Sequence, residues 1–371
     1  MHVESIKLIN FRNYLKADIN LNRKLNIFVG NNGQGKTNLL ESIYICAFGK
    51  SYRTNKDKEL INLSKDKAYI GINLKKNGFN KFVEVKFEQG KSKKVRINKI
   101  EVDKISDLFG ILNVVIFSPE DLKLIKEGPS ERRNFLDTEI SQIKPKYRYN
   151  ISSYNRILRQ RNNLLKITQN DKSKLKVLDV WDMQISNIGA EIILSRIKFL
   201  NKISKISKNI HSEITNKLEE LELKYSPSLD IDVNLDKNEI VKVFRRQLKN
   251  LLERDIEKGT TTIGPHRDDI KVLINGIDSR AFGSQGQQRT AALSLKLAEV
   301  ELIKEEVGEY PVLLLDDVLS ELDLNRRKDL ISTFKDIQTI ITTTDDIELK
   351  EVEKYQKSIF YINDGKIKPV E

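Results

Sequence analysis

Residues 30–37 read Gly30-Asn31-Asn32-Gly33-Gln34-Gly35-Lys36-Thr37 and match the pattern GxxxxGK[ST] at every fixed position. The apolar run Leu25–Val29 before it predicts a buried strand, and apolar residues at helical spacing after Thr37 predict a helix. Glycines let successive backbone N–H groups face phosphates, while Lys36 reaches the β and γ phosphates and Thr37 holds Mg²⁺. The motif predicts a phosphate-binding loop. An ordinary glycine-rich turn is the alternative, and the strand and helix around it disfavour that reading.

A second candidate site lies far along the chain, where the apolar run Val312–Leu315 ends in Asp316 and Asp317. A buried strand ending in carboxylates is the place for a Mg²⁺ ligand beside a phosphate loop. We expect Asp316 to hold the metal and Asp317 to polarise an attacking water. Without the glycine loop, the two residues could equally be solvated acids at the end of a strand.

The remaining chain alternates between strand-like and helical regions. Residues 66–102 contain short strand-like runs separated by Gly and Asn turns, which predicts an antiparallel meander. Residues 129–258 have helical spacing, and strand signals return at 270–274, 312–315 and 339–343. The sequence therefore predicts an α/β fold in which a helical insertion interrupts the β-rich part. The expected domains are 1–117 plus 262–371, which is a discontinuous lobe, and 118–261, which is a helical basic lobe.

Positive charge is concentrated in one internal segment of this 371-residue chain, whose net charge is +12. Residues 141–210 hold 15 Lys and Arg against 4 Asp and Glu, and the rest holds 50 against 49. Such a segment points to an anionic partner such as nucleic acid. The cations that could meet phosphates are Lys144, Lys146, Arg148, Arg156, Arg159 and Arg161. For any one of them, a solvated basic surface fits equally well.

Several classes of protein are excluded by composition. Cys46 is the single cysteine, so neither an intrachain disulfide nor a cysteine-built zinc site is possible. No run approaches 18 apolar residues, and the first residues do not resemble a signal peptide. We therefore expect a cytoplasmic protein without a membrane span.

A third motif, Ser284-Gln285-Gly286-Gln287-Gln288-Arg289-Thr290, precedes a helical stretch, and Ser320-Glu321-Leu322-Asp323 follows the second carboxylate strand. This order resembles the signature, Walker B and D-loop of ABC-type ATPases. In its Ser-Gln-Gly-Gln-Gln-Arg-Thr form, and together with four further motifs, it resembles the bacterial RecF recombination-mediator family over residues 10–323. The further motifs are Asn10-Phe11-Arg12-Asn13-Tyr14, Phe117-Ser118-Pro119-Glu120-Asp121-Leu122, Arg132-Arg133-Asn134-Phe135-Leu136-Asp137 and Gly264-Pro265-His266-Arg267-Asp268-Asp269.

The resemblance implies an ABC-type ATPase head of the SMC type without the long coiled coil, which binds ATP and Mg²⁺. In such proteins ATP closes two subunits face to face, so that Ser284 and Gly286 would meet the γ-phosphate held by the other subunit's Lys36. Asp323 would add a D-loop contact, and the implied catalytic set is Asp317, Lys36 and Ser284.

The resemblance also implies a role in DNA replication, recombinational repair and the SOS response. The expected homodimer forms with ATP, binds duplex and gapped DNA, and promotes recombinase loading with RecR, RecO and RecA as partners. The resemblance further implies a weak DNA-dependent ATPase in which ATP hydrolysis serves as a switch.

Two departures from ABC-type ATPases concern hydrolysis. Asp317 stands where a glutamate usually follows the Walker B aspartate, so a slow reaction is expected. Thr344-Asp345-Asp346 stands where many relatives place a switch histidine, and no such role is assigned here.

Other residues allow two interpretations each. Arg12 would approach the adenine by analogy with related heads, or lie at the surface. His266 would be catalytic or structural. The aromatic residues of the basic segment would stack on bases or, more often for such helices, belong to the core; they are Tyr147, Tyr149, Tyr154 and Trp181.

Three rival functions remain distinguishable by sequence or by simple assays. An SMC-like chromosome protein needs a much longer coiled coil than an insertion of about 130 residues supplies. A transporter ATPase subunit would copurify with membranes. An ATP-dependent nuclease needs a further cluster of metal-binding acids beyond Asp316 and Asp317.

Overall fold

The computed structural model describes residues 1–318, 330, 336–344 and 356–370. The chain divides into a discontinuous unit, Met1–Asp121 with Glu299–Glu371, and a middle unit, Leu122–Ala298.

The first sheet of the discontinuous unit is antiparallel throughout, with strand order β2-β1-β4-β5-β6-β7. Its strands are β1 (His2–Phe11), β2 (Tyr14–Asn20), β4 (Lys67–Lys76), β5 (Phe79–Glu88), β6 (Lys94–Ile97) and β7 (Ile100–Glu101). The meander expected over residues 66–102 is confirmed. Along β1, Ile6 and Leu8 are buried while Lys7 is exposed, so one face of this sheet joins the core and the other faces outward.

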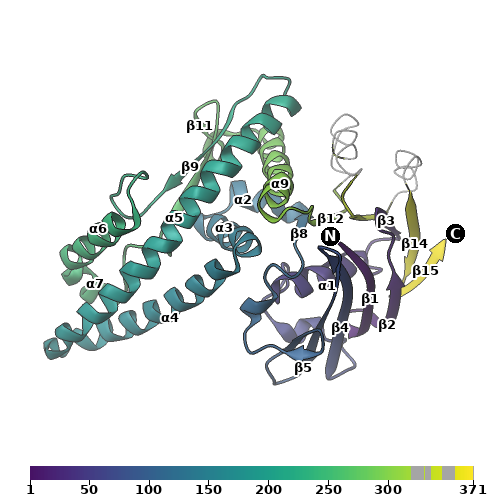
Figure 1. Ribbon diagram of the computed structural model, residues 1–371, viewed down its shortest axis with the longest axis horizontal. Helices are drawn as coiled ribbons and strands as arrows, with labels where there is room; N and C mark the ends of the chain where they lie inside the picture. Colours follow the sequence, from purple (N-terminus) through teal and green to yellow (C-terminus); the bar gives the residue numbers. More distant parts are fainter. Residues whose placement is uncertain (319–329, 331–335, 345–355, 371) are drawn as a thin grey trace. The chain divides into compact units, whose positions relative to one another are not determined.

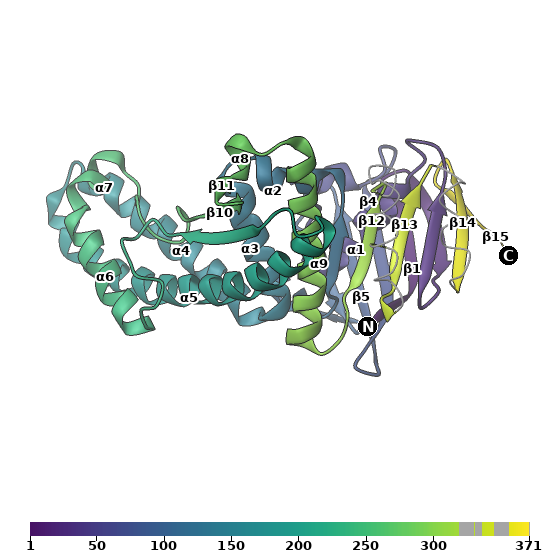
Figure 2. The same ribbon diagram turned by 90° about the horizontal axis from the view of Figure 1, so that it is seen from above.

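The second sheet of this unit has the order β15-β14-β3-β13-β12-β8 and is parallel except for the β14–β15 pair. Its strands are β3 (Leu25–Val29), β8 (Val114–Phe117), β12 (Val312–Asp316), β13 (Thr339–Thr343), β14 (Lys357–Asn363) and β15 (Lys366–Val370). Strands from both ends of the chain therefore form one sheet, because β3 pairs with β13 on one side and with β14 on the other, and Figure 2 shows β12 beside β13. The β14–β15 hairpin has no counterpart in the sequence-based expectation.

Helix α1 (Lys36–Phe48) packs against strands of both sheets and is buried over almost its whole surface. Residues of α1 such as Leu39, Leu40 and Ile43 join one hydrophobic cluster with residues of both sheets. The phosphate loop before α1 is thus anchored to the centre of this unit.

The middle unit consists of helices around a three-stranded sheet, β11-β10-β9. Figure 1 shows α4 and α5 as its two longest helices in contact, with α6 and α7 near one end. Its helices are α2 (Lys123–Lys126), α3 (Pro129–Ile143), α4 (Pro145–Thr168), α5 (Leu175–Ile214), α6 (Lys237–Asn250), α7 (Leu252–Lys258) and α8 (Ser279–Phe282). Helix α9 (Gln285–Val307) begins in this unit and continues into the discontinuous one.

The strands of the middle unit differ from the sequence-based expectation in one respect. β9 (Leu221–Ser226) interrupts the region 129–258 that the sequence predicts to be helical, and it pairs with β10 (Asp269–Ile274), which in turn pairs with β11 (Ile277–Asp278). This pairing draws residues after 262 into the middle unit. The contacts therefore divide the chain after Asp121 and after Ala298, whereas the sequence predicts divisions after 117 and after 261.

Candidate functional site

The phosphate loop lies between β3 and α1, as its sequence predicts. Gly33 and Gly35 adopt φ angles of +81° and +116°, which side chains other than glycine rarely tolerate. The Lys36 ammonium donates to the carbonyl oxygens of Gly30 at 2.5 Å and Asn31 at 3.1 Å. Burial lowers the pKa of Lys36, while Asp317 and Asp316 act in the opposite direction. The loop thus holds a lysine ammonium inside its own curl.

Asp316 lies beside Thr37, although the two residues are 279 positions apart. The Thr37 hydroxyl donates to Asp316 Oδ1 at 2.9 Å, and the Thr342 hydroxyl donates to the same oxygen at 3.0 Å. Tyr52 OH donates to Asp316 Oδ2 at 3.3 Å. The carboxyl ends of β3, β13 and β12 meet here, so the parallel sheet brings the two predicted metal ligands together.

Asp317 follows β12 directly and turns away from the strand direction. Its φ angle is +56°, and its backbone N–H donates to Thr342 Oγ1 at 3.1 Å. Burial raises the pKa of its carboxyl group, which the neighbouring Lys36 opposes and Asp316 reinforces. Asp316 and Asp317 are therefore held in different conformations at the end of one strand.

The turn between β1 and β2 supports the phosphate loop from one side. Asn13 Nδ2 donates to the Gln34 carbonyl oxygen at 2.8 Å, and Tyr14 OH donates to the Gly35 carbonyl oxygen at 2.9 Å. Arg12 makes a bidentate pair with the buried Glu41 of α1, at 2.9 Å and 2.8 Å. These contacts give Arg12 a structural partner, and Glu41 is a residue that the sequence reasoning missed.

The β14–β15 hairpin supports the same loop from another side. The backbone N–H groups of Asp364 and Gly365 donate to Gln34, to its side-chain Oε1 at 2.5 Å and its carbonyl oxygen at 3.1 Å. A hollow of about 680 Å³ lies beside the loop, and Gln34, Tyr361 and Lys366 are among the residues that line it. Lys366 and Lys368 bring positive charge to this hollow.

The signature motif belongs to the middle unit, at the start of α9. Ser284 and Gly286 are exposed, and a Cβ atom built on Gly286 would meet nothing closer than Ser284 Oγ at 4.0 Å. Packing among the described residues therefore gives no reason for glycine at this position. Phe282, two residues before Ser284, is 77% exposed. Asp323, with the rest of Ser320–Asp323, and Asp345 and Asp346 lie outside the described residues.

Arg161 does not belong to a DNA-facing surface, contrary to the sequence-based expectation. Its side chain is fully buried, donates to Asp182 at 2.6 Å and to Asp255 at 2.8 Å, and also contacts Thr261. Arg148 is half-buried, and burial lowers its pKa. The four remaining candidate cations are exposed on α4 and at its N-cap: Lys144, Lys146, Arg156 and Arg159.

Tyr147 and Tyr154 are buried, so neither presents a stacking surface, while Tyr149 is exposed and Trp181 is half-buried. The Tyr154 hydroxyl lies 2.8 Å from His266 Nδ1, and His266 Nε2 lies 3.0 Å from the Thr261 carbonyl oxygen. Burial lowers the pKa of His266 to about 4, so the ring is neutral near pH 7. These contacts favour a structural role for His266 over a catalytic one.

The motif that contains His266 also meets the motif that begins at Arg132. Arg132 forms a bidentate pair with Asp269, and Arg133 donates to the Asp268 carbonyl oxygen at 2.9 Å. Two motifs about 130 residues apart therefore pack together inside the middle unit.

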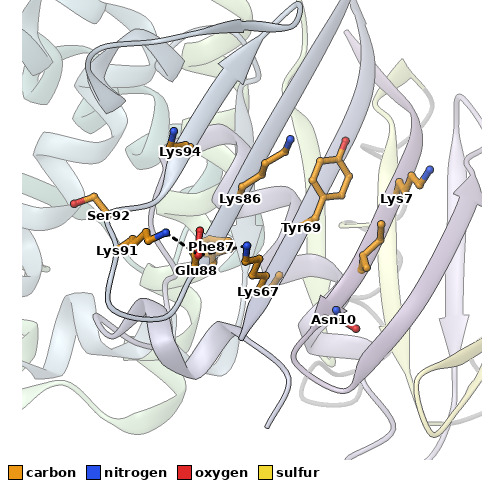
Figure 3. Close-up of a pocket in the computed structure, with 12 residues that line it drawn as sticks. Lys7, Asn10, Lys67, Tyr69, Lys86, Phe87, Glu88, Lys91, Ser92 and Lys94 are labelled. Atoms are coloured by element: carbon orange, nitrogen blue, oxygen red, sulfur yellow. Dashed lines mark hydrogen bonds and ion pairs between the residues drawn. The ribbon is translucent and has the colours of Figure 1, made fainter. Parts of the chain in front are cut away.

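A second hollow, of about 470 Å³, lies on the outward face of the first sheet. Figure 3 shows Tyr69 there, with Lys86, whose ammonium lies 5.7 Å from the centroid of the Tyr69 ring. Glu88 pairs with Lys67 and Lys91 at 3.4 Å and 2.9 Å. This surface is basic but lies outside the segment 141–210.

Neither a metal-binding cluster nor a membrane span is found in the described part of the chain. Within residues 1–318, 330, 336–344 and 356–370, no group of three or more His, Cys, Asp or Glu side chains is arranged to hold a metal ion. Over the same ranges, no helix combines the length and the hydropathy that a membrane span requires.

Comparisons with known proteins cover almost the whole chain. The family model of the RecF/RecN/SMC N-terminal domain matches residues 2–368. A protein of Alkaliphilus oremlandii named DNA replication and repair protein RecF is 50% identical over 367 residues, which cover 99% of this chain and 100% of that protein. A protein of Clostridium beijerinckii with the same name is 48% identical over 99% of this chain and 98% of its own length.

Solved structures also match this chain over its whole length. A structure described as the recombination mediator protein RecF-ATP in the RecFOR pathway matches with a TM-score of 0.94 and 36% identity, covering 100% of this chain and 98% of that one. An Smc head domain of Pyrococcus furiosus matches with a TM-score of 0.56 and 18% identity, covering 100% and 96%, and shares the fold alone.

Proposed function

The chain belongs to the RecF family, and from this premise we propose that it is an ATP-dependent DNA-binding protein of DNA replication and recombinational repair. The observation that carries the proposal is the contact between the Thr37 hydroxyl and the Asp316 carboxylate at the mouth of the phosphate loop. It brings together Thr37 and Asp316, which are 279 positions apart in the sequence and are both proposed to belong to the nucleotide site. The relatives named RecF and the RecF-ATP structure support the same role.

In this proposal the loop from Gly30 to Thr37 binds the triphosphate of ATP. Lys36 would exchange its contacts with the Gly30 and Asn31 carbonyl oxygens for phosphate oxygens. A hydroxyl and a carboxylate 2.9 Å apart are hard oxygen ligands, so Thr37 and Asp316 fit Mg²⁺. The metal would neutralise charge on the phosphates when bound.

The second part of the proposal is a homodimer that forms with ATP. Ser284 and the Gly286 N–H of one subunit would contact the γ-phosphate held by Lys36 of the other, with Asp323 nearby. Two observations support this arrangement: Gly286 has open space around its Cα, and Phe282 is exposed next to the loop. A glycine that no described neighbour requires suits a backbone that a ligand approaches closely.

Hydrolysis is proposed to be slow and to serve as a switch. Asp317 would orient the attacking water, and burial raises its pKa, which makes the carboxylate a stronger base. Its side chain is one methylene shorter than the glutamate usual at this position. The dimer is thus expected to persist until this weak ATPase step opens it.

DNA is the proposed partner of the helical basic lobe, through Lys144, Lys146, Arg156 and Arg159 on the exposed surface of α4 and its N-cap. The remaining lobe, with the phosphate loop, would supply the ATPase. Duplex and gapped DNA are the proposed substrates, and RecR, RecO and RecA the proposed partners in recombinase loading. The similar structure described as RecF-ATP in the RecFOR pathway supports partners of this kind.

Sedimentation velocity with and without ATP, repeated with gapped DNA, tests the proposal. Wild-type protein is expected to sediment as a monomer without nucleotide and as a dimer with ATP, and gapped DNA is expected to cosediment with the dimer. The Ser284→Arg variant is expected to bind ATP as a monomer and to remain one, because the bulky side chain blocks the partner's phosphate. Normal ATP-dependent dimerisation of this variant would refute the composite site.

A further inference from the structure

The start of α9 is fixed by a capping box between Ser284 and Gln287. Gln287 Oε1 accepts a hydrogen bond from the Ser284 backbone N–H at 2.9 Å, and Ser284 Oγ accepts one from the Gln287 N–H at 3.2 Å. This reciprocal pair satisfies two backbone donors at the helix start. The position of Ser284 therefore depends on which way the Gln287 amide points.

Glu219 selects the orientation of that amide. A glutamine side chain keeps its shape when its amide turns by 180°, but the turned amide would present NH₂ to the Ser284 N–H. Glu219 Oε1 accepts from Gln287 Nε2 at 2.9 Å. Because a carboxylate only accepts hydrogen bonds, Glu219 permits the orientation that completes the capping box and opposes the other one.

His211 holds Glu219 in place. His211 is fully buried at the end of α5, with Nε2 at 3.2 Å from Glu219 Oε2 and Nδ1 at 3.1 Å from Ser294 Oγ. Ser294 lies further along α9, so the histidine contacts the same helix whose start Glu219 controls. The carboxylate thus bridges α5 and α9 at the signature loop, Ser284–Gln288.

We propose that Glu219, held by His211, is a positioning residue for the signature loop. It keeps Ser284 and the Gly286 N–H in the geometry needed before a second subunit's nucleotide arrives. This inference rests on the proposed function, since it concerns how well the loop meets that nucleotide. Preorganisation of this kind acts on dimer formation and leaves the nucleotide affinity of the separate chain unchanged.

Three single variants test the proposal. Glu219→Ala removes the acceptor for the Gln287 amide. Glu219→Gln keeps an acceptor oxygen for Gln287 and can still contact His211 if the imidazole changes tautomer. Glu220→Ala is the matched control, because it removes the adjacent carboxylate, which pairs with Lys208 and lies outside this chain of contacts.

The first measurement is hydrogen exchange of nucleotide-free protein over peptides covering residues 279–290. We expect faster exchange at the start of α9 in Glu219→Ala, and wild-type exchange in Glu219→Gln and Glu220→Ala. This readout does not require dimerisation. Unchanged exchange in Glu219→Ala would overturn the positioning role whatever the oligomeric state.

The second measurement is ATP-dependent dimerisation by sedimentation, with the ATP affinity of the monomer measured alongside. Glu219→Ala is expected to weaken the dimer about tenfold per loop, or about a hundredfold for two loops, at unchanged monomer affinity for ATP. Glu219→Gln is expected to restore dimerisation. A Glu219→Gln dimer as weak as that of Glu219→Ala would refute the hydrogen-bond explanation, whereas a wild-type protein that never dimerises would refute the proposed function alone.

Discussion

Arg161 stands in the most basic part of the chain, yet its guanidinium group is completely buried between Asp182 and Asp255. Its partners lie 21 and 94 positions away, so no local pattern reveals that the charge is neutralised inside the middle unit. Positive charge in a segment is therefore a poor guide to the exposure of any one residue.

The Arg161→Ala substitution is expected to lower the free energy of unfolding by about 3–5 kcal/mol, because it leaves the buried Asp255 carboxylate without its cation. Arg159→Ala, two positions away at the surface, should change it by less than about 0.5 kcal/mol. Urea unfolding of both variants provides the measurement. Equal stability of the two variants would contradict the buried ion-pair assignment.

His266 is expected to make stability depend on pH. Burial lowers its pKa from 6.5 to about 4 in the folded chain, so the unfolded chain binds more protons between these values. Stability is therefore retained above about pH 6.5 and lost as the pH falls towards 4, with a contribution of about 3 kcal/mol. Unfolding titrations of wild type and His266→Gln should diverge in this interval, and parallel pH profiles would show that His266 does not titrate in this way.

Among the elements of the fold, the β14–β15 hairpin is one that the sequence analysis did not predict. Its turn is visible in the sequence, because the apolar run Ile359–Ile362 is followed, after one residue, by Asp364-Gly365, a dipeptide typical of hairpin turns. β9 is visible as well, because Leu221, Leu223 and Tyr225 alternate with polar residues. The phosphate loop and the β12 strand were predictable because local spacing dictates them, whereas contacts such as Glu219 with Gln287 join residues 68 positions apart.

Gly365→Ala tests whether the hairpin supports the proposed nucleotide site. Gly365 has φ +68°, and an added Cβ would lie 2.4 Å from the Asn13 carbonyl oxygen, so the turn must move away from Asn13, which disturbs the hydrogen bond from the Gly365 N–H to the Gln34 carbonyl oxygen. We expect nucleotide affinity to fall several-fold, measured with a fluorescent ATP analogue.

Gly276→Ala is the control for this substitution. Gly276 has φ +78° in the β10–β11 turn, but no atom of the residues that the structure describes lies within 4 Å of its added Cβ. Both variants should lose about 1 kcal/mol of stability from the left-handed backbone. Equal nucleotide affinity in the two variants would show that the hairpin contact with Gln34 is dispensable.

The exposed cations of α4 and its N-cap make the DNA proposal testable by charge. We expect a smaller slope of log K against log[salt] when Gln replaces Lys144, Lys146, Arg156 and Arg159. The magnitude of the slope should fall by up to about 3.6, which is about 0.9 for each phosphate that is no longer neutralised. The matched control replaces four lysines of the sheet hollow, Lys7, Lys67, Lys86 and Lys94, and removes the same charge from the chain. The same fall in affinity in both would mean that net charge, rather than the α4 surface, governs binding.

For the molecule as a whole, the two units carry complementary halves of one proposed site. Lys36, Thr37 and Asp316 belong to the discontinuous unit, and Ser284 and Gly286 belong to the middle unit. If the halves meet between two chains, a subunit that lacks one half can be completed by a subunit that lacks the other. If they act within one chain, such completion is impossible.

A mixing experiment decides between these possibilities. Lys36→Met removes the phosphate contact, and Ser284→Arg blocks the signature loop, so neither variant should dimerise with ATP alone. Their mixture contains heterodimers with one intact composite site. A mixture of wild type with the Lys36→Met/Ser284→Arg double variant contains the same substitutions per heterodimer, but no intact site.

Fluorescence-detected sedimentation with ATP, following a labelled Ser284→Arg chain in the first mixture and a labelled double-variant chain in the second, measures heterodimers directly. We predict that the label sediments as a dimer in the first mixture and as a monomer in the second. Identical sedimentation of the label in the two mixtures would contradict the nucleotide sandwich between Lys36 of one subunit and Ser284 of the other.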